Sequence, residues 1–540
     1  MKFGSLLFAL FLNALPLLGQ QAATVSGSVV NSVTGQTVKK AVVTLRNATG
    51  QTSLTTVSDQ SGKFHFDNVA PDRYSATAQA SGYSDNMRST GKPVLVAAQQ
   101  EVQDVEVRIP PLASISGKVV DENGQPMAEV NVMAVRYVYI GVGGKRLQTS
   151  GSAQTNDRGE YRMFDLQPER YYLIAMSNQR GSQPRPADGE NVHSTVPEEG
   201  YAPAFYPGVA DISQASPQEI KPGAEWAGAD FKLRQLPTYH IRGTLSGGTG
   251  ARGGRTMVRA QWCGQDESEL PFSLGVSQST GTSFDVSGAA PGTYCLMVQQ
   301  PAGGGMVAAK KVVTVKAGDI DGVEFAVPPA FTLNGTVTID GTPPTPMPQI
   351  NIGLYNIEAR GSRQGNVAKS DGSFQIDSLY PGSYTMSLPQ GQLYAKSILY
   401  GSQDVTNGVI PSLQPDIKLT ITLGTDPGEI DGTVQPGSVE SGAPVLVAAI
   451  PEDAYAARTD MQKLAPSAAG TNYSLANVPP GNYKVFALET SDFGDVMNRD
   501  LMKLLDGNAT AVTVTASGHQ QVSVTAIPAG VVEQAKRKLN

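Results

Sequence analysis

The sequence predicts an all-β protein: a tandem array of five immunoglobulin-like or prealbumin-like antiparallel β-sandwiches, with one short helix in the last. The first observation is an apolar-x-Gly-x-apolar pattern that occurs five times, with marker glycines at Gly27, Gly117, Gly243, Gly335 and Gly432. Later in each unit comes a marker aromatic, followed ten positions on by a marker tyrosine: Phe64/Tyr74, Tyr161/Tyr171, Phe284/Tyr294, Phe374/Tyr384 and Tyr473/Tyr483. An interval held constant in five copies indicates repeated modules.

Size and composition agree with this fold class. Five units between residues 23 and 528 average about 101 residues, the size of an immunoglobulin-like sandwich. The chain has 58 Gly, 36 Pro and only 16% charged residues, and short alternating apolar runs lie between clusters of turn residues. The net charge of −7, with no Lys/Arg run longer than Lys536-Arg537-Lys538, argues against a nucleic-acid-binding surface.

The repeats divide the chain into units. We expect a signal peptide at 1–22, sandwiches at 23–110, 111–236, 237–328, 329–424 and 425–528, and a C-terminal tail at 529–540. The second sandwich carries a long insertion, 178–228. Proline directly follows three closing strands, at Pro110, Pro237 and Pro328, and makes short, stiff junctions. These junctions predict a semi-rigid rod.

The N-terminus has the pattern of an export signal. Met1-Lys2 precedes the apolar run 6–18, which is too short for a permanent membrane anchor. No later apolar stretch is long enough to cross a bilayer as a helix. We therefore expect an exported protein (periplasmic, cell-surface or extracellular) with no integral membrane segment after signal removal.

Each recurrent residue has a structural reason. The marker glycine in the opening strand leaves room for a neighbouring chain segment or an aromatic ring, or forms a bulge. Asp59-x-x-Gly62 and its equivalents form tight turns, in which Asp bonds its own backbone and Gly accepts positive φ. The marker tyrosine then enters the next strand as a tyrosine corner, with a buried ring and a hydroxyl bonded to backbone. An alternating strand such as Val105–Ile109 closes each unit.

The last unit contains the predicted helix. Over residues 495–505, apolar side chains recur at helical spacing: Val496, Leu501, Leu504 and Leu505. Gly507 follows as a stop signal. We expect this helix to pack on the fifth sandwich.

Both cysteines, Cys263 and Cys295, lie in the third unit. Two cysteines in one small domain of an exported protein indicate a disulfide. Closing this 33-residue loop would stabilise the unit by roughly 3–4 kcal/mol. The alternative is a pair of buried free thiols.

The combination of the glycine pattern, Asp-x-x-Gly-x-aromatic and Pro-Gly-x-Tyr resembles carboxypeptidase regulatory-like domains, which belong with transthyretin-like and collagen-adhesin-B-like β-sandwiches. The resemblance is clearest in the first two units, for example in Ser116–Val120, Asn156–Tyr161 and Tyr171. The third unit departs from it by lacking the turn Asp. The length and additions also resemble bacterial exported proteins built from such domains. The resemblance implies a supporting or adhesive role and no catalytic residues.

The sequence lacks signatures of catalysis or cofactor binding. The four histidines, at 65, 193, 240 and 519, stand singly without metal-ligand spacing. There is no nucleophile elbow and no phosphate-binding loop. Each Asp-x-x-Gly turn offers one or two carboxylates, whereas calcium needs six or more oxygens. We therefore expect no enzyme, no cofactor and no metal site.

Carbohydrate binding is the most specific activity that the sequence suggests. The insertion gathers four aromatic residues that could stack on sugars: Tyr201, Phe205, Tyr206 and Trp226. Alternatively, these rings fold the insertion back onto the sandwich and bury apolar area. The leading hypothesis is a non-catalytic exported scaffold, spacer or adhesion element, and carbohydrate binding is the alternative. A third hypothesis is an accessory subunit that docks a partner through sheet edges. Expected partners are a polysaccharide or another envelope or extracellular protein.

Overall fold

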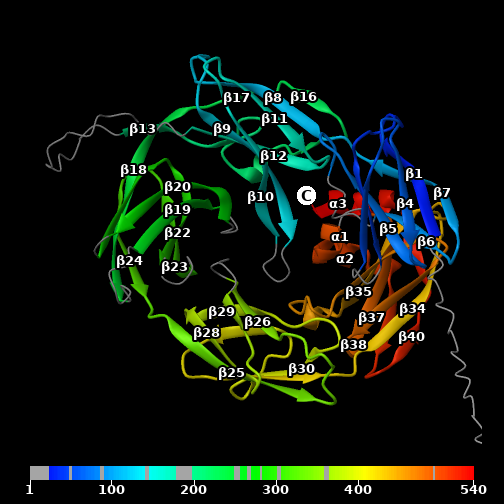
Figure 1. Cartoon of the computed structure of the whole chain (residues 1–540). Coiled ribbons are helices and arrows are strands. Elements are labelled where there is room, and N and C mark those ends of the chain that lie inside the picture. The colour runs from blue at the N-terminus through cyan, green and yellow to red at the C-terminus, as the bar shows by residue number, and fades with distance from the viewer. Residues whose placement is uncertain are drawn as a thin grey trace, which may run out of the picture.

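The computed structural model describes residues 23–47, 52–84, 91–139, 145–177, 198–247, 256–263, 269–279, 282–300, 306–357, 364–490 and 493–539. In this part of the chain, five β-sandwiches follow one another in sequence order (Figure 1), and the predicted fold class is confirmed. The predicted signal peptide, residues 1–22, lies outside the described residues. None of the described helices combines the length and the apolarity that a membrane crossing requires.

Sandwich 1 has the plan that the others repeat. Its three-stranded sheet has the order β4-β1-β7, and its four-stranded sheet the order β3-β2-β5-β6. The core lies between the sheets, where Val25, Phe64 and Val107 are buried. The strands are β1 (Ala23–Asn31), β2 (Val42–Asn47), β3 (Ser53–Val57), β4 (Lys63–Val69), β5 (Asp72–Gln79), β6 (Lys92–Val96) and β7 (Glu101–Ile109).

Sandwich 2 gains strands from its insertion. One sheet has the order β11-β8-β16, with β17 also paired to β8; the other has the order β10-β9-β12-β14, with β15 also paired to β12. The insertion thus supplies short strands to both sheets. The elements are β8 (Ala113–Val120), β9 (Val130–Tyr139), β10 (Lys145–Gln154), β11 (Glu160–Leu166), β12 (Arg170–Ser177), β14 (Ala204–Phe205), the 3-10 helix η3 (Ile212–Gln214), β15 (Gln218–Glu219), β16 (Glu225–Ala227) and β17 (Phe231–Lys232).

Sandwich 3 contains a strand that comes from the insertion of sandwich 2. This strand, β13 (Glu198–Tyr201), pairs antiparallel with β18 in a sheet of order β13-β18-β21, to which β24 also pairs. The opposite sheet has the order β20-β19-β22-β23. The strands are β18 (Gln235–Gly247), β19 (Thr256–Cys263), β20 (Glu269–Ser279), β21 (Ser283–Ala289), β22 (Gly292–Gln300), β23 (Met306–Val315) and β24 (Ile320–Val327).

Sandwich 4 packs a five-stranded sheet, β28-β25-β33-β30-β31, on a four-stranded sheet, β27-β26-β29-β32. Its core and that of sandwich 3 form one continuous cluster of buried residues. The strands are β25 (Phe331–Asp340), β26 (Asn351–Asn356), β27 (Gln364–Val367), β28 (Ser373–Leu379), β29 (Gly382–Ser387), β30 (Tyr394–Tyr400), β31 (Gln403–Asp404), β32 (Val409–Leu413) and β33 (Leu419–Gly424).

In sandwich 5, a closing strand joins the two sheets into one eight-stranded sheet, with the path β36-β35-β38-β41-β34-β37. Off this path, β39 pairs with β38 and β40 pairs with β34. The elements are β34 (Gly428–Gln435), β35 (Pro444–Pro451), η5 (Asp453–Tyr455), β36 (Lys463–Ala468), β37 (Asn472–Val478), β38 (Gly481–Leu488), η6 (Asp506–Asn508), β39 (Thr510–Val514), β40 (His519–Gln521) and β41 (Val524–Ile527).

Helices cover the face of β35 and β38 that points away from the core between the sheets of sandwich 5. The predicted helical segment consists of α1 (Phe493–Met497) and α2 (Arg499–Leu504), and the C-terminal tail forms α3 (Ala529–Leu539). The side chains of Leu501 and Val532 are buried in a second core together with Phe486 of β38. The helical layer on this sandwich therefore contains α3 as well as the predicted helical segment.

Each opening strand is central in its sheet in the same way. It runs antiparallel to the strand of the marker aromatic and parallel to the closing strand. The marker glycine lies directly opposite the marker aromatic in all five ladders, from Gly27 opposite Phe64 to Gly432 opposite Tyr473. A Cβ on any of these glycines would collide with a backbone carbonyl of the closing segment or with the aromatic ring. The predicted close approach is confirmed.

The predicted tyrosine corner is present in all five sandwiches. Each marker tyrosine donates its hydroxyl to the backbone carbonyl four residues earlier, and each is buried. The five bonds are Tyr74 to Ala70 at 3.0 Å, Tyr171 to Gln167 at 2.9 Å, Tyr294 to Ala290 at 2.7 Å, Tyr384 to Tyr380 at 2.8 Å and Tyr483 to Pro479 at 2.7 Å.

The sandwiches form a ring, and the predicted rod is wrong (Figure 1). From blue through cyan, green and yellow to red, the chain returns to its start, and sandwich 5 lies beside sandwich 1. There, Arg73 of β5 donates to the backbone carbonyl of Asn472 in β37 at 3.0 Å. The helices of sandwich 5 lie toward the middle of the ring, where α1 contacts β9. The short junctions keep consecutive sandwiches close together, but the lateral contacts between sandwiches determine their relative orientation.

Candidate functional site

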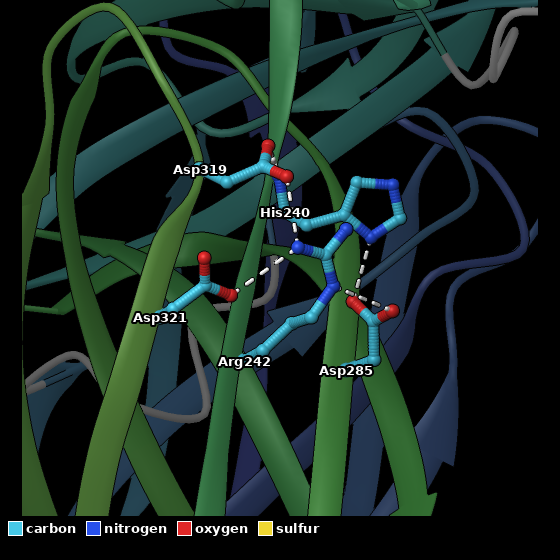
Figure 2. A network of polar contacts seen from close by, with 5 residues as sticks. All are labelled: His240, Arg242, Asp285, Asp319 and Asp321. Carbon is cyan, nitrogen blue, oxygen red and sulfur yellow. Dashed lines mark hydrogen bonds and ion pairs between the residues drawn. The ribbon is translucent and has the colours of Figure 1, made fainter. Parts of the chain in front are cut away.

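A network of ionisable side chains lies on the outward face of sandwich 3 (Figure 2). Alternate residues of β18 point into the core, so His240 and Arg242 point outward. Arg242 Nη1 donates to Asp319 Oδ2 at 2.8 Å and to Asp321 Oδ1 at 3.2 Å. Arg242 Nε donates to Asp285 Oδ2 at 3.3 Å, and His240 Nδ1 lies 2.7 Å from Asp285 Oδ1. The network joins β18, β21 and the start of β24.

Arg242 is the cation that holds these carboxylates together. Burial lowers the pKa of Arg242, but its hydrogen bonds to Asp319 and Asp321 raise it, and the net shift is upward. A hydrogen bond from the backbone N–H of His240, followed by those from Arg242, lowers the pKa of Asp319. Both groups are therefore held in their charged forms, and the network acts as a charge-assisted tie between three strands.

The predicted aromatic platform is divided between two environments. Phe205 is 2% exposed, so its ring is not available to a ligand from solvent. Tyr201, Tyr206 and Trp226 are half-buried against the core of sandwich 2. Tyr206 packs edge to face on Trp226, with ring centroids 5.3 Å apart, and on Phe231 at 6.0 Å. A ligand role for Tyr201, Tyr206 and Trp226 stays a prediction.

Phe205 lies instead where sandwich 2 meets sandwich 3. Trp262 of β19 packs against the apolar cluster that contains Phe205. Its ring centroid is also 4.5 Å from that of the marker tyrosine Tyr294. The next residue, Cys263, forms a disulfide with Cys295 of β22, with a Cα–Cα distance of 5.6 Å. The disulfide thus joins the two strands that present Trp262 to sandwich 2. The remaining buried members of the cluster are Met133, Val135, Leu147 and Ile174.

A buried ion pair of sandwich 5 contacts sandwich 4 through its arginine. The side chains of Arg458 and Asp460 are 1% and 3% exposed and pair at 2.8 Å. The Arg458 guanidinium also donates to the backbone carbonyls of Thr406 at 2.8 Å and Ala395 at 3.0 Å, both in sandwich 4. Since both charges are buried, removing either would leave the other uncompensated. The sequence analysis missed this pair, because an isolated Arg-x-Asp carries no signal of burial.

The contacts that close the ring, between sandwich 5 and sandwiches 1 and 2, are more polar than the contact between sandwiches 2 and 3. Besides the bond from Arg73 to Asn472, Arg537 of α3 lies 3.8 Å from Glu219 of β15, and both of these side chains are more than 60% exposed. Exposed pairs of this kind contribute little to stability. The contacts between sandwiches 2 and 3, 3 and 4, and 4 and 5 include buried side chains. Among the contacts of the described residues, the weaker seam of the ring therefore lies where sandwich 5 meets sandwiches 1 and 2.

One group of side chains has the composition of a metal site. Glu429 and Asp431 of β34 and His519 of β40 place a carboxylate oxygen or ring nitrogen within 4.8 Å of one another. The sequence analysis predicted no metal site because His519 lies 88 residues from Asp431. Parallel pairing of β34 with β40 brings them together.

Comparison with known proteins gives one family match. Residues 24–109 match the family model of the carboxypeptidase regulatory-like domain. No curated protein matches the chain.

Among solved structures, the minor pilin GBS52 of Streptococcus agalactiae is 12% identical over 40% of this chain and 97% of its own, with a TM-score of 0.24. BcpA, the major pilin subunit of Bacillus cereus, is 11% identical over 75% of this chain and 99% of its own, with a TM-score of 0.15. The Bacillus anthracis TIE protein is 9% identical over 74% and 72%, with a TM-score of 0.17. Identities and TM-scores this low say nothing about how this chain functions.

The family match covers sandwich 1 from its first strand to its last. The other four sandwiches repeat its parallel closing strand, its glycine–aromatic pair and its tyrosine corner. Sandwich 1 thus matches the carboxypeptidase regulatory-like domain, and the chain is a tandem array of five sandwiches built on the same plan.

Proposed function

We propose that this protein is an exported, non-catalytic scaffold or adhesion element that holds five sandwiches in a ring and presents their outward faces to an envelope or extracellular protein. The observation that carries the proposal is the set of contacts between neighbouring sandwiches, some of which are buried. The β13–β18 ladder, the Trp262 contact and the Arg458–Asp460 pair would hold neighbours in defined orientations, as a scaffold requires.

The use of the recurrent residues supports the same proposal. The marker glycines, aromatics and tyrosines are all occupied in strand pairing and in the tyrosine corners. The charged network of sandwich 3 lies on an outward sheet face and ties strands together. The disulfide fits an oxidising compartment outside the cytoplasm.

Co-purification would test the scaffold function. Tagged full-length chain would be expressed in its native cells, cross-linked in the envelope and purified with its partners. We expect a defined envelope or extracellular protein in stoichiometric amount, and we expect Arg458→Leu, which disturbs the contact between sandwiches 4 and 5, to reduce its recovery. The exposed Arg46→Ala variant is the matched control and should retain the partner. Recovery of the chain alone, from all cell fractions, would contradict the proposal.

Carbohydrate binding has weaker support, because the structure buries Phe205 and packs Tyr206 edge-on between Trp226 and Phe231. Pull-down on insoluble polysaccharides would test it with the wild type, Tyr206→Ala and the exposed control Tyr355→Ala. Retention lost only in Tyr206→Ala would favour the carbohydrate-binding alternative over the protein-docking scaffold.

A further inference from the structure

Glu429, Asp431 and His519 converge on the outward face of sandwich 5. Ile430, between the two acidic residues, is fully buried, so both carboxylates point away from the core. In the parallel pairing of β34 with β40, Glu429 lies opposite His519. The imidazole Nε2 of His519 is in direct contact with Asp431 Oδ2.

Neighbouring groups hold this arrangement in place. Glu429 Oε1 accepts a hydrogen bond from Ser474 Oγ of β37 at 3.0 Å. Gln521 Nε2 lies 3.5 Å from His519 Nε2. The Asp431 side chain is 24% exposed and that of His519 is 57% exposed, so the site is open to an ion from solvent. Three strands therefore position the ligand atoms before any ion arrives.

The equivalent sheet face of sandwich 3 has a positively charged side chain, that of Arg242. Arg242 and Asp431 each stand directly before the marker glycine, and each opposes a residue of the marker-aromatic strand, Asp285 or Ser474. In sandwich 3, the Arg242 guanidinium lies among three carboxylates. In sandwich 5, the equivalent position is itself a carboxylate. Within the described residues, neither Glu429 nor Asp431 pairs with a lysine or arginine.

We propose that Glu429, Asp431 and His519 bind a divalent first-row transition ion, for which Zn²⁺ is the probe. One imidazole nitrogen and two carboxylates are common zinc ligands, and a site with three protein ligands leaves a position for water. Calcium and magnesium prefer shells made entirely of oxygen, so the histidine selects against them. The ion would tie β40 to β34 and would supply the positive charge that Arg242 supplies in sandwich 3.

Calorimetric titration of ZnCl₂ into metal-free residues 23–540, without a histidine tag, would test the site. We expect one zinc per chain and a higher unfolding temperature for the zinc-bound protein. Loss of outer-shell partners already weakens metal sites by roughly 10–100-fold, so His519→Ala and Asp431→Asn should each weaken zinc binding at least tenfold. His240→Ala, in the equivalent sheet of sandwich 3, is the matched control and should bind zinc as the wild type does.

Four results would overturn the proposal. The first is no zinc binding by the wild type at 100 µM. The second is unchanged affinity in both His519→Ala and Asp431→Asn, with circular dichroism confirming that they fold. The third is an equal loss in His240→Ala, which would identify scattered surface binding. A wild-type preference for Ca²⁺ over Zn²⁺ would contradict the proposed ligand chemistry.

Discussion

Gly243 lies directly opposite Phe284 in the β18–β21 ladder, and the phenyl ring occupies the space that a side chain at Gly243 would need. A Cβ built on Gly243 would come within 2.7 Å of the ring and would collide with the carbonyl oxygen of Val323 on β24. The closing strand and the aromatic ring thus both depend on the glycine. In the other four sandwiches the marker glycine also lies opposite the marker aromatic and against backbone of the closing segment.

Gly243→Ala is therefore expected to destabilise sandwich 3 by roughly 3 kcal/mol, because backbone on one side and a packed ring on the other leave the methyl group no room. Hydrogen-exchange mass spectrometry on the whole chain would report faster exchange in β18, β21 and β24. Gly318→Ala is the matched control, since a Cβ there meets no atom within 4 Å. Equal exchange in the two variants would show that the close approach does not matter.

A second prediction concerns the residue four positions after each marker aromatic. Asn68, Asp165, Gly288, Ser378 and Asn477 all have positive φ, between 56° and 78°. Serine tolerates this conformation less well than glycine. Ser378→Gly should therefore stabilise sandwich 4 by about 0.5–1 kcal/mol, and Gly288→Ala should destabilise sandwich 3 by about 1 kcal/mol. Urea unfolding would measure both, and the same sign of change in both variants would contradict the prediction.

Alkaline pH should destabilise sandwich 5 through Tyr473. Burial, and secondarily the charge of Asp431, raise the pKa of Tyr473 to about 12. An unfolded tyrosine has a pKa of about 10, so the folded state keeps its proton longer. The stabilising contribution is complete below about pH 10 and is lost as the pH rises toward 12.

Urea unfolding between pH 8 and 12 would measure this loss. Tyr473→Phe should show a shallower decline than the wild type, and phenylalanine fits because sandwiches 1, 3 and 4 have it at this position. The exposed Tyr355→Phe is the control and should follow the wild type. A decline as steep in Tyr473→Phe as in the wild type would show that other groups cause it.

Removing the disulfide should lower the stability of sandwich 3 by roughly 3–4 kcal/mol, the chain-entropy value for a bridge with a sequence separation of 32. The Cys263→Ser/Cys295→Ser double variant would be compared with the wild type by urea unfolding under oxidising conditions. Because these strands present Trp262, exchange at the sandwich 2 contact should also increase. Two titratable thiols in unreduced wild-type protein would mean that the bond does not form.

Breaking the buried ion pair of sandwich 5, whose arginine also bonds to sandwich 4, should be costly. Arg458→Leu would leave Asp460 buried without a partner, which costs about 3–5 kcal/mol. The Arg458→Leu/Asp460→Leu variant should recover part of this loss, because no unpaired charge remains. Hydrogen exchange in β30 and β36, with small-angle scattering to detect a more open ring, would measure both variants. Arg537→Leu, at an exposed pair, should change stability by less than about 0.5 kcal/mol.

The sequence was sufficient to predict the repeated architecture, because the residues that build it recur at fixed intervals. Gly243, Phe284 and Tyr294 each have a steric or hydrogen-bonding role that admits few substitutes. The positive-φ position four residues after each marker aromatic was not predictable, because Asn, Asp, Ser and Gly all occupy it and no single residue type repeats. The parallel pairing of the opening and closing strands was also missed, because the alternation of apolar and polar residues along one strand does not show which strand pairs with it or in which direction.

Contacts between sandwiches could not be predicted from local patterns. Phe205 belongs to a group of aromatic residues typical of a ligand platform, but it is buried in a cluster against which Trp262 of another sandwich packs. Likewise, the grouping of Asp431 with His519 depends on the pairing of β34 with β40. The repeated spacing of residues within one sandwich is enough to predict the fold of that sandwich. These two groups of side chains form only when segments far apart in the sequence come together in the folded chain.

The parallel run of first and last strands determines how each unit responds to pulling. When two such strands are drawn apart by their free ends, they slide along each other, and every hydrogen bond between them bears load at once. Antiparallel neighbours pulled from one end would instead unzip one bond at a time. Because β1 with β7 and the four equivalent pairs share this shear geometry, tension on the chain would open the seam of the ring before any unit yields.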